Sequence, residues 1–122
     1  MQTHHFENLE VWKRGCRMAV DVCAAAAPSK DFALKEQITR AALSIPSNIA
    51  EGAERGSDAD FTRFLTYSKG SCGELRTQLL IHLALSKQLG IEPFTGTQAM
   101  IEETRELSKM LGALIHKLSP SA

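Results

Sequence analysis

Apolar side chains recur at steps of three and four residues along four stretches of this 122-residue chain. Such steps place apolar side chains on one face of an α-helix, because a helix turns once every 3.6 residues. No stretch alternates apolar and polar residues with enrichment in β-branched side chains, so strands are not expected. The pattern therefore predicts an all-α fold with helices at about residues 8–27, 32–54, 58–87 and 95–118.

Residues that start or stop helices lie between these stretches. Pro28 ends the first, Asp31 and Ser57 are suited to N-cap the second and third, and Gly90 stops the third. Short connections make sequential helices antiparallel neighbours, and the length suits one domain. We therefore predict a single antiparallel up-down-up-down four-helix bundle over residues 1–122.

Pro46 lies inside the apolar stripe of the second predicted helix. Proline lacks a backbone N–H, so it is expected to kink the helix or to split it there. If the helix restarts, Ser44 is a suitable cap for the new segment.

The third predicted helix becomes apolar nearly all round in its C-terminal half, where Leu80, Ile81, Ala84 and Leu85 follow one another closely. A helix that is apolar on every side must be covered on every side, whereas a helix in a four-helix bundle keeps one face in water. The sequence thus predicts a homo-oligomer, with interface residues Trp12, Leu80, Ile81 and Leu85.

Polar side chains interrupt the apolar faces of the second and third helices. They form a predicted polar network of Arg40, Ser44, Asn48, Glu51, Ser71 and Glu74. Gly70 and Gly73 indicate that the two helices approach closely beside it. We favour a structural network that fixes helix register over the alternative, a catalytic pair of Glu51 and Glu74, because perturbed carboxylates also occur in structural networks.

Motifs for metal or phosphate binding are not found in the sequence. His82 and His116 do not lie in the Glu-x-x-His motifs of di-iron bundles, and Cys16, Cys23 and Cys72 contain no C-x-x-C pair. Neither of the two glycine-rich phosphate-binding motifs, G-x-x-x-x-G-K-[ST] and G-x-G-x-x-G, is present. We predict no catalytic residues, no metal, no cofactor and no small-molecule substrate.

The 14 basic residues balance the 14 acidic residues, so no bulk charge attracts nucleic acid. Lys13, Arg14 and Arg17 form a local basic cluster and are the candidate nucleic-acid contacts, although we favour a solvated surface.

The N-terminus lacks the basic start and apolar run of a secretory signal, and the apolar run 79–85 is too short for a membrane span. Three cysteines within helical patterns suit a reducing compartment, so we predict a cytoplasmic protein without a membrane partner.

The chain resembles the bacterial four-helix-bundle family of 23S rRNA intervening-sequence proteins over about residues 6–118. Three blocks carry the resemblance, and the part from Ser44 to Gly52 is the most specific. The blocks are residues 6–13 (FENLEVWK), residues 37–52 (QITRAALSIPSNIAEG) and residues 61–65 leading to 70–74 (GSCGE).

This resemblance implies a small cytosolic homo-oligomer, with a pentameric barrel as the usual assembly, and no established enzymatic activity. A related branch comprises accessory proteins of diversity-generating retroelements, basic barrels that bind nucleic acid and a reverse transcriptase. The alternative function is therefore a nucleic-acid-binding accessory module with an RNA or reverse-transcriptase partner. The neutral charge of this chain departs from that branch.

Overall fold

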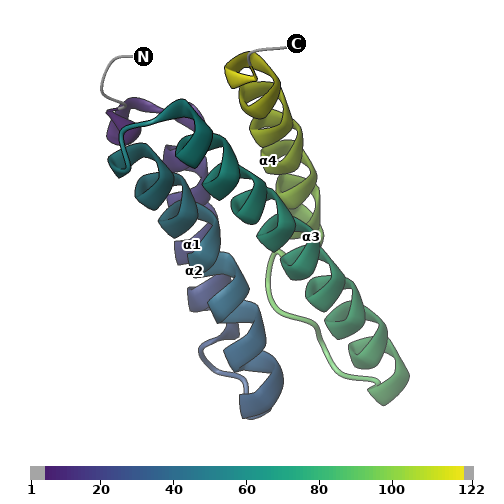
Figure 1. The fold of residues 1–122 in the computed structure, drawn as a ribbon. Coiled ribbons are helices and arrows are strands. Elements are labelled where there is room, and N and C mark those ends of the chain that lie inside the picture. The colour runs from purple at the N-terminus through teal and green to yellow at the C-terminus, as the bar shows by residue number, and fades with distance from the viewer. Residues whose placement is uncertain (1–4, 120–122) are drawn as a thin grey trace.

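The computed structural model describes residues 5–119. Part of the N-terminal segment from which we predicted the absence of a secretory signal lies outside the described residues. Over this range a 3₁₀ turn at Phe6–Asn8 precedes α1 (Glu10–Ala26), α2 (Phe32–Glu54), α3 (Asp58–Leu89) and α4 (Thr97–Leu118), with no strand. Successive helices run antiparallel, and α1 lies diagonally opposite α3 (Figure 1). The predicted all-α four-helix bundle is confirmed.

The predicted helix boundaries follow from capping interactions. The Asp31 carboxylate accepts a hydrogen bond from the Leu34 N–H (3.2 Å), and the Ser57 hydroxyl accepts one from the Asp60 N–H (3.1 Å). Gly90 is the stop, as predicted, with a φ of +68°, and the last helical residue is Leu89, two residues past the predicted bound at 87. The α4 helix begins at Thr97 rather than Thr95, because Gly96 adopts a φ of +81° and turns the chain just before it.

The α2 helix continues through Pro46, so the predicted split is wrong; a kink at this residue stays a prediction. Ser44 lies within the helix and is not a cap. The neighbouring helices explain why the helix persists: Gly15 of α1 packs against the Pro46 ring, and the Ser68 hydroxyl of α3 donates to the Ile45 carbonyl (2.8 Å). These tertiary contacts support the backbone where proline removes a donor.

All four helices contribute to a continuous apolar core. In α2, α3 and α4 the expected apolar stripe faces inward, because its residues recur at the helical period. In α1 the expected stripe of Leu9, Trp12, Cys16, Ala19, Val20 and Cys23 is wrong: the buried residues are Val11, Gly15, Met18, Ala19, Val22 and Ala26, and Val20 is 66% exposed. The largest fully buried core side chains are Phe61, Ile38, Ile45, Ile49, Leu65, Leu75, Leu79, Ile101, Leu107, Leu111 and Val22.

The α3 helix extends past its partner α4. It has 32 residues against 22, lengths of about 48 Å and about 33 Å at the helical rise. The connection 90–96 runs back along α3, because the Phe94 N–H donates to His82 Nε2 (2.9 Å). Since α4 begins three residues after Phe94, the turns of α3 beyond His82 project past its start (Figure 1).

Candidate functional site

The predicted polar network is divided in the structure between a small contact across α2 and α3 and several exposed pairs. The hydroxyls of Ser44 and Ser71 hydrogen-bond to each other across the two helices. Asn48 Nδ2 donates to the carbonyl of Ser44, one turn earlier in its own helix (2.8 Å). Only these members of the predicted stripe lie together at the α2–α3 contact.

The charged members of the stripe are exposed and face water. Arg40 pairs with Glu36 (3.1 Å), and Glu51 pairs with Arg55 (3.1 Å), each four residues away on α2. Glu74 is exposed on α3. Within residues 5–119 no hydrogen bond or ion pair joins Glu51 to Glu74, and the ion-pair partner of Glu51 is Arg55 of its own helix.

Ser68 is a buried polar residue of α3 that lies outside the predicted network. Its side chain is fully buried, and its hydroxyl donates to the Ile45 carbonyl of α2 (2.8 Å). The adjacent Pro46 was the available signal, because proline disturbs the hydrogen bonding of the turn around it.

Different glycines from those predicted mark the close approach of the helices. Gly70 has open space around it, and a Cβ on Gly73 would meet only the Arg76 side chain, so the predicted role of both is wrong. A Cβ built on Gly52 of α2 would instead lie 2.6 Å from the Phe64 Cβ of α3. Both predicted glycines face away from α2, whereas Gly52 lies on the buried face of α2.

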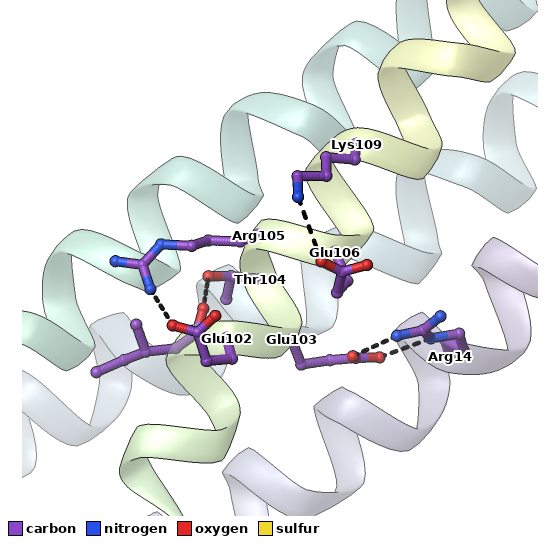
Figure 2. Close-up of polar contacts among 8 residues, drawn as sticks. Arg14, Glu102, Glu103, Thr104, Arg105, Glu106 and Lys109 are labelled. Atoms are coloured by element: carbon purple, nitrogen blue, oxygen red, sulfur yellow. Dashed lines mark hydrogen bonds and ion pairs between the residues drawn. The ribbon is translucent and has the colours of Figure 1, made fainter.

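An ion pair joins α1 to α4. The Arg14 guanidinium donates from Nε to Glu103 Oε2 (2.9 Å) and from Nη2 to Oε1 (2.6 Å), forming a two-pronged contact (Figure 2). Donating these hydrogen bonds to the Glu103 carboxylate raises the pKa of Arg14. The remaining ion pairs within the described chain join residues of one helix.

This contact divides the candidate nucleic-acid cluster. Lys13 and Arg17 are exposed, whereas the Arg14 guanidinium is bound by Glu103. Glu106 lies one turn along α4 from Glu103 and its charge acts on Arg14, whereas Glu102 points away from Arg14 toward Arg105 (Figure 2). A phosphate approaching Arg14 would therefore meet carboxylates, which weakens the electrostatic case for this cluster.

His82 fastens the α3–α4 connection. Its side chain is buried, its Nε2 accepts the Phe94 N–H, and its ring stacks on the Phe94 ring with centroids 3.7 Å apart. Burial lowers the pKa of His82, and the nearby Asp31 carboxylate opposes this shift. The imidazole is therefore neutral and acts as an acceptor, which is a structural role.

The predicted interface residues fall into two groups. Leu80, Ile81 and Leu85 are 43%, 53% and 39% exposed on the last turns of α3. Trp12 is half-buried, packs against the core and meets the Phe6 ring edge-to-face at 5.3 Å. Trp12 therefore packs within its own chain, whereas Leu80, Ile81 and Leu85 are left partly exposed by it.

No cluster of three or more His, Cys, Asp or Glu side chains suited to a metal occurs in the part of the chain that was described. Burial raises the pKa of all three cysteine thiols, that of Cys72 to about 11, so they are poor nucleophiles at neutral pH. Among residues 5–119, none of the helices is long and apolar enough to cross a membrane.

The family model of the 23S rRNA-intervening sequence protein matches residues 7–113. The chain belongs to this family. The match confirms the predicted resemblance and covers α1, α2, α3 and most of α4. No curated protein matches this family member.

A solved structure supports the fold of this family member. It is the crystal structure of a protein of unknown function from the S23 ribosomal protein family of Bacteroides thetaiotaomicron VPI-5482. The two chains are 24% identical with a TM-score of 0.73, over 86% of this chain and 97% of the other. At this identity the likeness shows a shared fold.

Proposed function

We propose that this chain is a non-enzymatic protein whose function is to assemble with copies of itself into a pentameric ring. The observation that carries the proposal is the uncovered apolar surface on the last turns of α3. We call this surface the α3 face and define it by residues Leu80, Ile81, Ala84, Leu85 and Leu89.

The length difference between α3 and α4 explains why the α3 face is bare. The turns beyond His82, which carry Ala84, Leu85 and Leu89, project past the start of α4, so no helix of the same chain covers their outer sides. Leu80 and Ile81 lie just before His82 and are 43% and 53% exposed. Residues 77–86 also carry no Lys, Arg, Asp or Glu. Covering one half-exposed leucine or isoleucine stabilises a protein by on the order of 1 kcal/mol, so this surface favours association.

Five subunits are the number that the family resemblance implies, and a ring of identical contacts agrees with it. A non-enzymatic role is supported by the surroundings of the reactive groups: Glu51 and Glu74 are exposed, the cysteine thiols have raised pKa values, and His82 holds a loop.

Light scattering coupled to size-exclusion chromatography, over a wide range of protein concentrations, tests the proposal. We expect a mass near five times 13.4 kDa that persists on dilution. A folded monomer at every concentration would contradict self-assembly, and a stable assembly of another size would contradict the subunit number.

The alternative of a nucleic-acid-binding module has its own measurement. Fluorescence anisotropy with labelled RNA and DNA at low salt should show no binding under our proposal. Binding that weakens steeply with salt and disappears in Lys13→Glu/Arg17→Glu would favour the alternative, because phosphate contacts release counterions.

A further inference from the structure

We infer that the partner of the α3 face is a different surface on the next copy, the outer side of α1, so that subunits join head to tail. This inference rests on the proposed self-assembly and names the two surfaces that meet. We call the second surface the α1 face and define it by residues Val20, Ala24 and Ala27 with the adjoining Phe32.

The α1 face is uncovered in the same way as the α3 face. Val20 is 66% exposed and Phe32 is 71% exposed, and both alanines are exposed. Residues 22–29 carry no formal charge, as residues 77–86 of α3 carry none. The chain therefore has two separate apolar surfaces on helices that its own bundle leaves open.

The two faces supply part of a subunit contact, because each side of a contact uses one face. The large side chains of the α3 face are on average about half exposed, and those of the α1 face about two-thirds exposed. At about 150 Å² for a fully exposed large side chain, the α3 face offers on the order of 300 Å² to one neighbour and the α1 face on the order of 200 Å² to the other. A specific interface buries about 800 Å² on each partner, so these side chains would form its apolar centre and the residues around them would supply the rest.

The shapes of the two faces are also compatible. The α3 face is the convex side of one helix. The α1 face is a ridge between two grooves, one against α4 of about 700 Å³ that includes Ala24, and one against α2 of about 420 Å³ that includes Ala27 and Phe32. Helices pack by placing the ridges of one into the grooves of another, so α3 of one copy fits beside α1 of the next.

The charged residues at the edges of the faces include one complementary pair, while the edge of the α1 face also holds the cations Arg17 and Lys35, the latter with its Nζ 5.0 Å from the Phe32 ring centroid. Lys87 lies beside the α3 face and Asp21 beside the α1 face, and both are exposed. Neither has an ion-pair partner among residues 5–119. Bringing the two faces together places a cation and an anion of opposite partners at the same rim, which favours this pairing over α3 with α3.

The position of the faces in the bundle directs the assembly. The α1–α2 connection and the C-terminal end of α3 lie at the same end of the molecule, while α1 and α3 are diagonally opposite (Figure 1). One chain cannot bring its own two faces together, but each copy can offer one face to each neighbour. Such heterologous contacts form a ring when the rotation between neighbours closes and an open filament when it does not, and the proposed pentamer is the closed case.

Paired lysine substitutions test this pairing. Ile81→Lys/Leu85→Lys blocks the α3 face, and Val20→Lys/Ala24→Lys blocks the α1 face; the matched control Thr66→Lys/Ala113→Lys changes exposed positions elsewhere. Circular dichroism checks that each variant is folded. In light scattering we expect each blocked variant to be monomeric and the control to match the wild type.

Mixing the two blocked variants decides the pairing. Each retains the face that the other lacks, so an equal mixture should form a dimer with one copy of each. If the α1 variant keeps the wild-type mass, or if the mixture stays monomeric, the pairing is wrong although self-assembly stands. If the α1 variant fails to fold, Phe32→Lys at the exposed start of α2 replaces it with the same expected outcomes. A monomeric wild type would instead contradict the proposed function.

Discussion

Two glycines show how the surroundings of a residue set its energetic role. Gly52 and Gly70 both lie inside helices, where glycine usually costs stability relative to alanine. Gly52 faces Phe61 and Phe64 of α3, whereas Gly70 is exposed with open space around its Cα. The same substitution should therefore have opposite effects at the two positions.

We predict that Gly52→Ala destabilises the protein by about 1–3 kcal/mol, because the new Cβ must displace Phe64 and the backbone of Phe61. Gly70→Ala is the matched control and should stabilise by about 0.5–1 kcal/mol through the backbone entropy of the unfolded chain. Urea denaturation followed by circular dichroism measures both. Equal effects of the two substitutions would contradict the assigned packing.

His82 gives the protein a pH-dependent stability. Burial lowers its pKa in the folded state below the ordinary value of about 6.5, so the unfolded chain binds more protons as the solution becomes acidic. The contribution of His82 to the free energy of unfolding is therefore fully present above a pH of about 6.5. This contribution is lost as the pH falls from there toward the pKa that His82 has in the folded state.

We predict that the melting temperature falls from neutral to mildly acidic pH and that His82→Gln flattens this fall. Glutamine can accept the Phe94 N–H but does not titrate, so the variant is less stable at neutral pH, having lost the ring stacking. His5 and His116 are exposed and are present in both the wild type and His82→Gln, so they do not explain a difference between the two pH profiles. An unchanged pH profile in the variant would exclude His82 as its cause.

At the scale of the helices, α1 and α4 are held together partly by the ion pair of Arg14 and Glu103, which contains two hydrogen bonds. Both side chains are about one-third exposed, and the pair closes the contact between the first and last helices. The ion pair of Glu51 and Arg55, by contrast, lies within one turn of α2 and is more exposed.

A double-mutant cycle with Arg14→Gln and Glu103→Gln should give a coupling energy of about 1 kcal/mol, which salt reduces. The control cycle with Glu51→Gln and Arg55→Gln should give about 0.3–0.5 kcal/mol, as is typical of exposed pairs four residues apart. A coupling energy between Arg14 and Glu103 no larger than that of the control pair would show that the ion pair between α1 and α4 does not stabilise the packing of these helices.

The α2–α3 contact combines small apolar and polar groups. Gly52 lets the backbones come close near one end, and Ser44, Ser68 and Ser71 supply hydroxyls farther along. These hydroxyls are short enough to bond across the contact without holding the helices apart. The pairing of α2 with α3 is therefore specific in register as well as apolar.

For the whole molecule, assembly should contribute to stability. A partner that binds only the folded chain raises the apparent free energy of unfolding with the logarithm of the partner's concentration, by mass action. We predict that the melting temperature rises with protein concentration for the wild type and is independent of it for Ile81→Lys/Leu85→Lys. A concentration-independent wild-type melting temperature, with the assembly already present, would show that folding is not coupled to association.

The sequence by itself determined the helices, their order and the exposed apolar surface of α3. These depend on local signals: the helical period of the apolar residues, the caps at Asp31 and Ser57, and the glycine stop at Gly90. The blocks that carry the family resemblance are also local in sequence, and the family match follows from them.

Only the tertiary structure decided which side chains meet. The sequence favoured Gly70 and Gly73 for the close approach and a split at Pro46, but the packing partners of Gly52 and Pro46 come from other helices. Likewise Arg14 finds Glu103 eighty-nine residues away, which removes it from the basic cluster. Helical periodicity gives the face on which a residue lies, whereas the rotation and register of neighbouring helices depend on the packing of the whole core.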